Sequence, residues 1–183
     1  MRLFVAVRPP DDVIAAVEVA LAPARRSMVG PKWTTPDQWH ITLQFLGQVP
    51  EEAVVDVAHA LEAVSKVPPF PIRLAGGGGF PRAERARVVW LGVGPGGDRV
   101  AELAHSVNGA LEPLGLLPED RPYHPHLTLA RLKVSGDVGP AIEALGTDPV
   151  GKAFVVDEVV LYESKVSRAG TRYETVATVP LEG

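Results

Sequence analysis

The chain of 183 residues contains no cysteine. This absence excludes disulfide bonds, a thiolate nucleophile and any zinc site built from cysteine, and it is typical of proteins from a reducing compartment. The first apolar segment, at residues 3–7, ends at Arg8 and two prolines, so it is too short for a signal sequence or a membrane span. We therefore expect a cytoplasmic protein with no membrane partner.

An excess of positive charge is also missing. The formal net charge of −4 argues against a protein that binds duplex nucleic acid over a broad surface, but it allows a local basic pocket for one phosphate or RNA end. The chain is 46% hydrophobic and 22% charged, a composition typical of globular proteins with a sizeable core. We expect a monomer that forms one bilobal domain over residues 1–183.

The hydrophobic pattern predicts an alternation of strands and helices. Helical spacing is found at 11–26, after Pro50, at 99–114 and at 138–145, and strand-like segments fill most of the intervals. We expect Gly76–Gly79 to form a hairpin loop between two strands, and the polar segment 165–170 to form another hairpin turn.

Two of the five histidines stand in matching sequences close to half the chain apart, "WHITLQFLG" with His40 and "HPHLTLARL" with His126. Because residues i and i+2 of a strand share a face, His40 lies beside Thr42 and His126 beside Thr128. The repeat predicts an α+β fold of two pseudo-equivalent lobes. Each lobe would be an antiparallel sheet flanked by helices, and the two His-x-Thr-x strands would face a central cleft.

Two such pairs around one small anion suit hydrolysis of a phosphodiester without a metal. A neutral histidine can take a proton from water while a protonated one gives a proton to the leaving oxygen. Threonine hydroxyls can hold the non-bridging oxygens as charge develops on them. A single motif of this kind is commonly structural, but two matching copies favour catalysis. We expect no metal and no other cofactor.

The segments "HITLQFLG" and "HLTLAR" resemble the paired signatures of the 2H phosphoesterases, in particular the RNA 2′,3′-cyclic phosphodiesterase branch once named 2′-5′ RNA ligases. "RLFVAVRPP", "GGFPRAERARVVWLGV" and "VVLYESKVSRAGTRYETVAT" extend the resemblance over nearly the whole chain. The resemblance implies a bilobal fold with a central cleft and no metal. It also implies an enzyme that opens a 2′,3′-cyclic phosphate at an RNA 3′ end to a 2′-phosphomonoester, with reversible 2′-5′ ligation as a side activity.

The resemblance also implies roles for the motif residues. By motif position, His40 is the proton donor to the leaving O3′ and His126 is the acceptor that activates water, although the residue types alone do not distinguish acid from base. Thr42 and Thr128 would bind the phosphate.

Two further positions match the family pattern, Arg131 as a phosphate ligand and Phe45 as a stacking partner for the terminal base. Strand alternation points both side chains away from the motif histidines. Each therefore needs a bend or bulge to reach the cleft. Core packing is the alternative for Phe45.

Other features allow several interpretations. Gly92–Gly97 satisfies G-x-G-x-x-G, but Pro95 lies inside it and no parallel sheet is predicted around it, so we expect a strand-to-helix loop rather than a dinucleotide site. His124 forms an H-x-H pair with His126, but no third metal ligand stands nearby. The basic loop with Arg82, Arg85 and Arg87 and the segment with Lys165 and Arg168 could contact RNA or be solvated faces.

Alternatives to the leading function remain open. The same chemistry would serve a phosphodiesterase for small cyclic nucleotides, such as ADP-ribose 1″,2″-cyclic phosphate. The motifs could also hold an RNA end without hydrolysing it. The expected partners are therefore RNA 3′ ends or cyclic-phosphate nucleotides.

Overall fold

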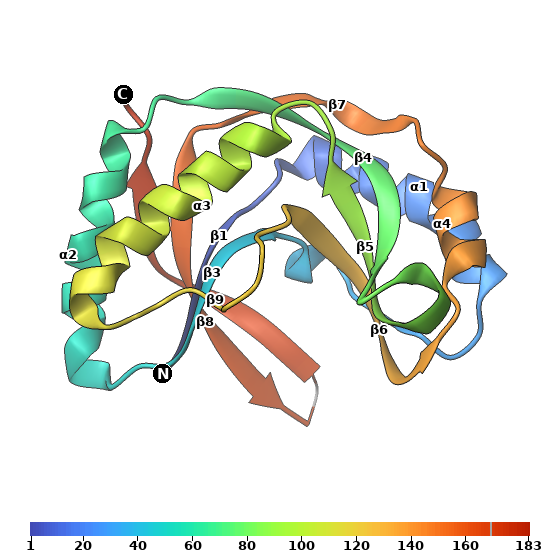
Figure 1. The fold of residues 1–183 in the computed structure, drawn as a ribbon, viewed down its shortest axis with the longest axis horizontal. Helices are drawn as coiled ribbons and strands as arrows, with labels where there is room; N and C mark the ends of the chain where they lie inside the picture. Colours follow the sequence, from blue (N-terminus) through green and yellow to red (C-terminus); the bar gives the residue numbers. More distant parts are fainter. Residues whose placement is uncertain (169) are drawn as a thin grey trace.

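The computed structural model describes residues 1–168 and 170–183, and its strands form one antiparallel sheet (Figure 1). Its nine strands run in the order β7-β4-β5-β6-β3-β1-β8-β9, with β2 paired to β6. The strands are β1 (Arg2–Val7), β2 (Lys32–Trp33), β3 (Ile41–Gln48), β4 (Phe70–Phe80), β5 (Ala86–Val93), β6 (His126–Gly136), β7 (Pro149–Val156), β8 (Glu158–Ser167) and β9 (Gly170–Pro180).

The α+β class is as predicted, but the expectation of two separate sheets is wrong. β3 and β6, which carry the two histidine motifs, pair with each other through Ile41 and Leu127 and so join the halves into one sheet. The junction is narrow, because Ile41 and Leu127 form the one residue pair between β3 and β6. The sheet curls strongly along its length (Figure 1).

Four α-helices cover the sheet in two pairs, α1 (Asp11–Ser27) with α4 (Gly139–Leu145) and α2 (Val54–Leu61) with α3 (Gly97–Leu111). α1 and α4 pack against β7 and β4, whereas α2 and α3 pack against β9 and β3 (Figure 1). α1 follows β1 in the chain, but it packs on β7 at the other end of the sheet. α3 follows β5, but it packs on β3 in the half that contains β1. This exchange gives the molecule a single hydrophobic core.

Apolar residues at helical spacing explain these contacts. Along α1, the buried side chains are Val13, Ile14, Val17, Leu21 and Ala24. Within residues 1–168 and 170–183, the helices are all too short or too polar to cross a membrane.

The prediction of a hairpin loop at Gly76–Gly79 is also wrong, because these glycines lie inside β4. Gly78 pairs with Trp90 of β5, and a Cβ atom at Gly78 would lie 2.0 Å from the Trp90 ring. The glycines therefore mark a close approach of the indole to the backbone of β4 rather than a turn. The chain turns instead through Ala83–Arg85.

The other two loop predictions have different outcomes. Gly92–Gly97 connects β5 to α3 beside an antiparallel sheet, so the strand-to-helix connection is confirmed. The turn predicted at 165–170 includes residue 169, which lies outside the described residues. The flanking strands β8 and β9 pair as far as Ser167 and Gly170.

We expect Gly78→Ala to lower the free energy of unfolding by about 1–3 kcal/mol, because the added methyl group overlaps Trp90. Urea denaturation followed by circular dichroism would measure the loss. Gly109→Ala is the matched control: this exposed helical glycine has open space around its Cβ position, so the protein should gain about 0.4–1 kcal/mol. Equal urea midpoints for Gly78→Ala and the parent protein would contradict the packing argument.

Candidate active site

The two histidine motifs meet where β3 pairs with β6. Ile41 and Leu127 face each other across the junction, and both are fully buried in the core. Neighbouring residues of a strand point to opposite faces, so His40 and His126 lie on the other side of the sheet. The structure thus brings the predicted histidines to adjacent strands and to one face.

Thr42 and Thr128 lie on the same face of the sheet as the two histidines. Continuing the antiparallel register from the Ile41–Leu127 pair places Thr128 across from His40 and Thr42 across from His126. Each of the four side chains is half-buried. The arrangement supplies two imidazoles and two hydroxyls on a rigid support.

Both imidazoles are held in the same way. The Nδ1 atom of His40 lies 2.7 Å from the carbonyl oxygen of Gln38, and the Nδ1 atom of His126 lies 2.7 Å from the carbonyl oxygen of His124. Because a carbonyl oxygen only accepts, each Nδ1 carries the hydrogen and donates it. The Nε2 atom of each ring is left to accept or donate a proton in chemistry.

An aromatic cluster surrounds His40. Its ring centroid lies 4.8 Å from that of Phe4 and 5.1 Å from that of Tyr173, the latter edge-on at 90°. Phe4 also stacks on Tyr162, with centroids 5.3 Å apart. A second cluster surrounds the other motif histidine.

In that second cluster, the His126 ring lies 4.8 Å from Phe80 and 6.2 Å from Trp90. The exposed ring of His124 lies 4.6 Å from Trp90. His124 thus belongs to the wall of the site and also supplies the carbonyl that holds His126.

These surroundings disfavour the charged imidazoles. Burial lowers the pKa of His40 to about 4, the charges of His126 and Arg131 lower it further, and the hydrogen bond to Gln38 opposes the shift. Burial is also the main reason that the pKa of His126 is lowered, with contributions from His124, Arg121 and Arg131. Both histidines are therefore neutral at pH 7 in the free protein.

Arg131 reaches this face because β6 contains a bulge. Thr128 pairs with Trp90, but Ala130 pairs with Val89, which leaves Leu129 as an extra residue. The extra residue reverses the alternation, so Leu129 and Ala130 are both buried and Arg131 is exposed. The guanidinium is the smallest of the contributions that lower the pKa of the two motif histidines.

Phe45 is redirected in the same manner. On β3, Thr42 pairs with Ala6 but Gln44 pairs with Val5, so Leu43 is the extra residue. Phe45 is consequently 45% exposed, and its ring centroid lies 6.0 Å from that of Phe4, beside His40. The predicted bend is therefore present before both Phe45 and Arg131, as the bulges at Leu43 and Leu129. Phe45 is too exposed to be a core residue.

A hollow of about 210 Å³ opens beside His40 on the β3 half of the sheet. It is lined by Arg8, Asp37, Trp39, His40, Tyr162, Tyr173 and Thr175. Tyr162 and Tyr173 were not predicted from the sequence, because they come from β8 and β9, far along the chain from His40. Their presence in alternating strands was a usable signal, since the chain has few aromatic residues.

The loop at 115–125 is fastened to the β3 motif at two points. The Tyr123 hydroxyl donates to the carbonyl oxygen of Thr42 at 2.8 Å, and the buried Gln44 amide donates to the carbonyl oxygen of Leu116 at 2.8 Å. Burial raises the pKa of Tyr123, so this hydroxyl stays a donor. The segment before the second motif thereby holds the first.

Among residues 1–168 and 170–183, no group of three or more His, Cys, Asp or Glu side chains is close enough together to hold a metal ion. Lys165 in the β8–β9 hairpin donates to Glu174 and also lies near Glu163. Its charge is therefore balanced within the hairpin.

Comparison with curated proteins identifies relatives with one name, RNA 2′,3′-cyclic phosphodiesterase. The protein from Aeropyrum pernix is 35% identical over 153 residues, which cover 81% of this chain and 86% of the relative. The protein from Geobacillus stearothermophilus is 35% identical over 182 residues, which cover 98% of this chain but 57% of that longer relative.

Solved structures and a family model also match this chain over most of its length. The protein TT0787 of Thermus thermophilus superposes with a TM-score of 0.81 and 31% identity over 100% of this chain and 99% of that one. Escherichia coli LigT complexed with 3′-AMP superposes with a TM-score of 0.77 and 28% identity over 100% and 98% of the two chains. Residues 9–168 match the model of the 2′-5′ RNA ligase superfamily, and the chain therefore belongs to that superfamily.

Proposed function

We propose that this chain is an RNA 2′,3′-cyclic phosphodiesterase that opens the cyclic phosphate at an RNA 3′ end to a 2′-phosphomonoester. The observation that carries the proposal is the pair of histidines on adjacent strands, each with Nδ1 held by a backbone carbonyl so that Nε2 is left for proton transfer. The name shared by the relatives and the 3′-AMP bound to LigT support an RNA-end substrate.

In the proposed reaction, Nε2 of His126 accepts a proton from water as the water oxygen attacks phosphorus. The bond between phosphorus and O3′ breaks, and Nε2 of His40 gives its proton to O3′. The products are a 2′-phosphate and a free 3′-hydroxyl. The hydroxyls of Thr42 and Thr128 and the guanidinium of Arg131 bind the non-bridging oxygens while negative charge develops on them. A 5′-hydroxyl in place of water would give a 2′-5′ linkage, the expected side activity.

This division of roles sets a condition on protonation. His40 is neutral in the free protein, because its pKa lies at about 4, yet the donor must carry a proton. The bound phosphodiester is an anion and opposes the effect of Arg131, so it raises the pKa of His40. His40 therefore takes up its proton together with the substrate.

The proposal treats the chain as a single bilobal domain with two pseudo-equivalent halves around a central cleft. Three local features support the equivalence: a carbonyl two residues before each histidine holds its Nδ1, a bulge follows each threonine, and the side chain five residues after each histidine turns to the site. Those last side chains are Phe45 and Arg131. We assign the phosphate to Arg131 and base stacking to Phe45.

We expect His40→Ala and His126→Ala each to lower kcat by about 10²–10⁴-fold, because each removes one proton-transfer group. The substrate is an RNA oligonucleotide that ends in a 2′,3′-cyclic phosphate, and mass spectrometry and ³¹P NMR identify the product. His105→Ala, exposed on α3, is the matched control and should keep full activity, as should the parent protein in EDTA. Full activity of the double histidine variant, or a 3′-monoester as the product, would overturn the proposal.

Removal of one threonine hydroxyl should weaken the binding of developing charge. Thr42→Val and Thr128→Val keep the shape of the side chain but lose the donor, so we expect kcat to fall by about 10²-fold for each. Thr→Ser at the same positions retains the hydroxyl and should restore most of the rate. Steady-state kinetics on the same oligonucleotide would measure the difference, and equal rates for Val and Ser would exclude a role for the hydroxyls.

We expect kcat/KM to fall as the pH rises above 6.5, by up to about tenfold per unit. The pKa values of both histidines lie below the ordinary 6.5 in the free protein, so the protonated donor becomes scarcer as the pH rises. The alkaline limb of kcat should lie at higher pH, since the bound anion raises the pKa of the donor. Profiles at constant ionic strength test this, and a kcat/KM that is flat or rises from pH 6.5 to 8.5 would contradict it.

A further inference from the structure

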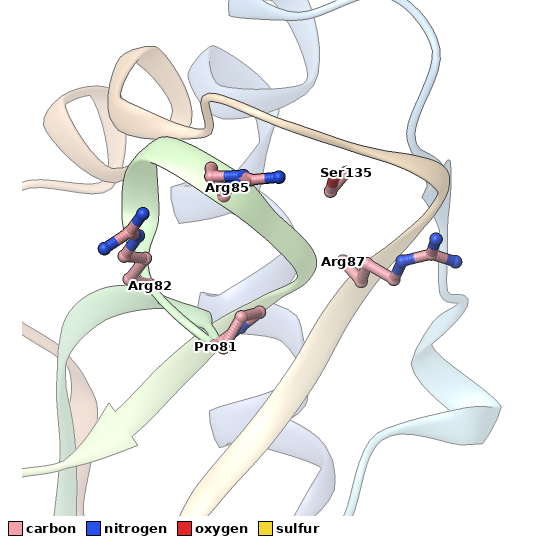
Figure 2. A pocket seen from close by; sticks show the side chains of 5 residues that line it. All are labelled: Pro81, Arg82, Arg85, Arg87 and Ser135. Atoms are coloured by element: carbon pink, nitrogen blue, oxygen red, sulfur yellow. The ribbon is translucent and has the colours of Figure 1, made fainter.

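A second hollow, of about 500 Å³, lies at the end of the β4–β5 hairpin. It is lined by Pro81, Arg82, Arg85, Arg87 and Ser135. Figure 2 shows the Arg85 guanidinium pointing toward Ser135, which comes from the far end of β6. Three arginines within six positions give this hollow a strongly positive lining, although the chain as a whole is acidic.

The arginines of the hollow lack acidic partners. Across the described part of the chain, Arg82 and Arg85 make no ion pair and no side-chain hydrogen bond, and Arg87 donates only to the carbonyl oxygen of Lys133, at 3.1 Å. Two other exposed arginines do have such partners, in the pairs Arg8–Asp11 and Arg172–Glu174. Each guanidinium has five N–H donors, so this hollow presents many free donors to an anion.

A row of paired strand residues connects the hollow to the proposed active site. Phe80 of β4 pairs with Val88 of β5, and Val88 pairs with Arg131 of β6, so the three residues form one row across the sheet. Arg131 bears on both motif histidines, and the Phe80 ring lies 4.8 Å from that of His126. Two residues that line the hollow are chain neighbours of this row: Pro81 follows Phe80, and Arg87 precedes Val88. The positive lining therefore continues from Arg131 away from the catalytic residues.

An RNA whose 3′ end occupies the active site must leave the site in its 5′ direction. Its backbone carries one negative phosphate per nucleotide, and arginine forks bind phosphate oxygens in a bidentate manner. The Ser135 hydroxyl adds a further donor. Contacts of this kind position a nucleic acid without reading its sequence.

Resting on the proposed function, we propose that the hollow of Arg82, Arg85, Arg87 and Ser135 binds a backbone phosphate of the RNA on the 5′ side of the cyclic end. A cyclic mononucleotide such as 2′,3′-cyclic AMP carries no phosphate on the 5′ side, so the hollow has no role in its binding. The preferred substrate is therefore an oligoribonucleotide rather than a cyclic mononucleotide.

The test compares the double variant Arg82→Ala/Arg85→Ala with the parent protein. Fluorescence anisotropy gives the Kd for an oligoribonucleotide that ends in a 2′-phosphate, at several salt concentrations between about 50 and 200 mM. We expect the variant to bind about tenfold more weakly and its plot of log affinity against log salt to be shallower by about 0.7 for one lost phosphate contact. The value of kcat/KM on 2′,3′-cyclic AMP should stay within about twofold of the parent value, since that substrate does not reach the hollow.

The matched control is Lys66→Ala/Lys152→Ala, which removes the same formal charge from the short helix at 62–66 and from β7. An unchanged Kd for Arg82→Ala/Arg85→Ala, a loss no larger than that of the control, or an equal loss of kcat/KM on cyclic AMP would overturn the inference. Hydrolysis of neither substrate by the parent protein would instead reject the proposed function. The anisotropy comparison decides the role of the hollow in either case.

Discussion

The pairing of Ile41 with Leu127 connects β3 to β6, and the geometry of the site depends on it. Their side chains enter the core from the two halves of the sheet. Because strand neighbours alternate, burying these two residues turns both motif histidines to the opposite face. A slip of one residue at this junction would send one histidine into the core. The burial of this single pair thus determines whether the two imidazoles lie on the same face of the sheet.

The bulges at Leu43 and Leu129 have the complementary effect. Each breaks the alternation just after a threonine, so each strand presents a third side chain to the site in addition to its histidine and threonine. Without the bulges, Phe45 and Arg131 would compete with core residues for space. Both strands are therefore regular through the histidine and the threonine. They become irregular just before Phe45 and Arg131, whose side chains the bulges turn to the site.

Much of the fold and the centre of the site were predictable from the sequence. The α+β class, the helices and the shared face of His40 and Thr42 follow from periodicity, which depends only on local geometry. Arg131 and Phe45 were predicted as site residues from the family resemblance. Strand alternation predicted that each would need a bulge to reach the site, and the structure contains both bulges. Local patterns do not determine which strands become neighbours, and for that reason the joined sheet was not predicted.

The remaining differences have similar causes. Gly76–Gly79 look like a loop when glycine is considered alone, and their place in β4 depends on Trp90, which is distant in sequence. Likewise, Tyr162 and Tyr173 line the hollow beside His40 because β8 and β9 follow β1 in the sheet order. Such contacts require the tertiary arrangement, since no spacing along the chain encodes them.

The carbonyl groups that hold the two Nδ1 atoms have an evolutionary consequence. Each acceptor belongs to the main chain, at Gln38 and at His124, so replacement of either side chain leaves the acceptor in place. The tautomer of each imidazole is thus insulated from mutation at the neighbouring positions. Substitutions in the wall of the site can therefore accumulate while the orientation and tautomer of the two imidazoles stay the same.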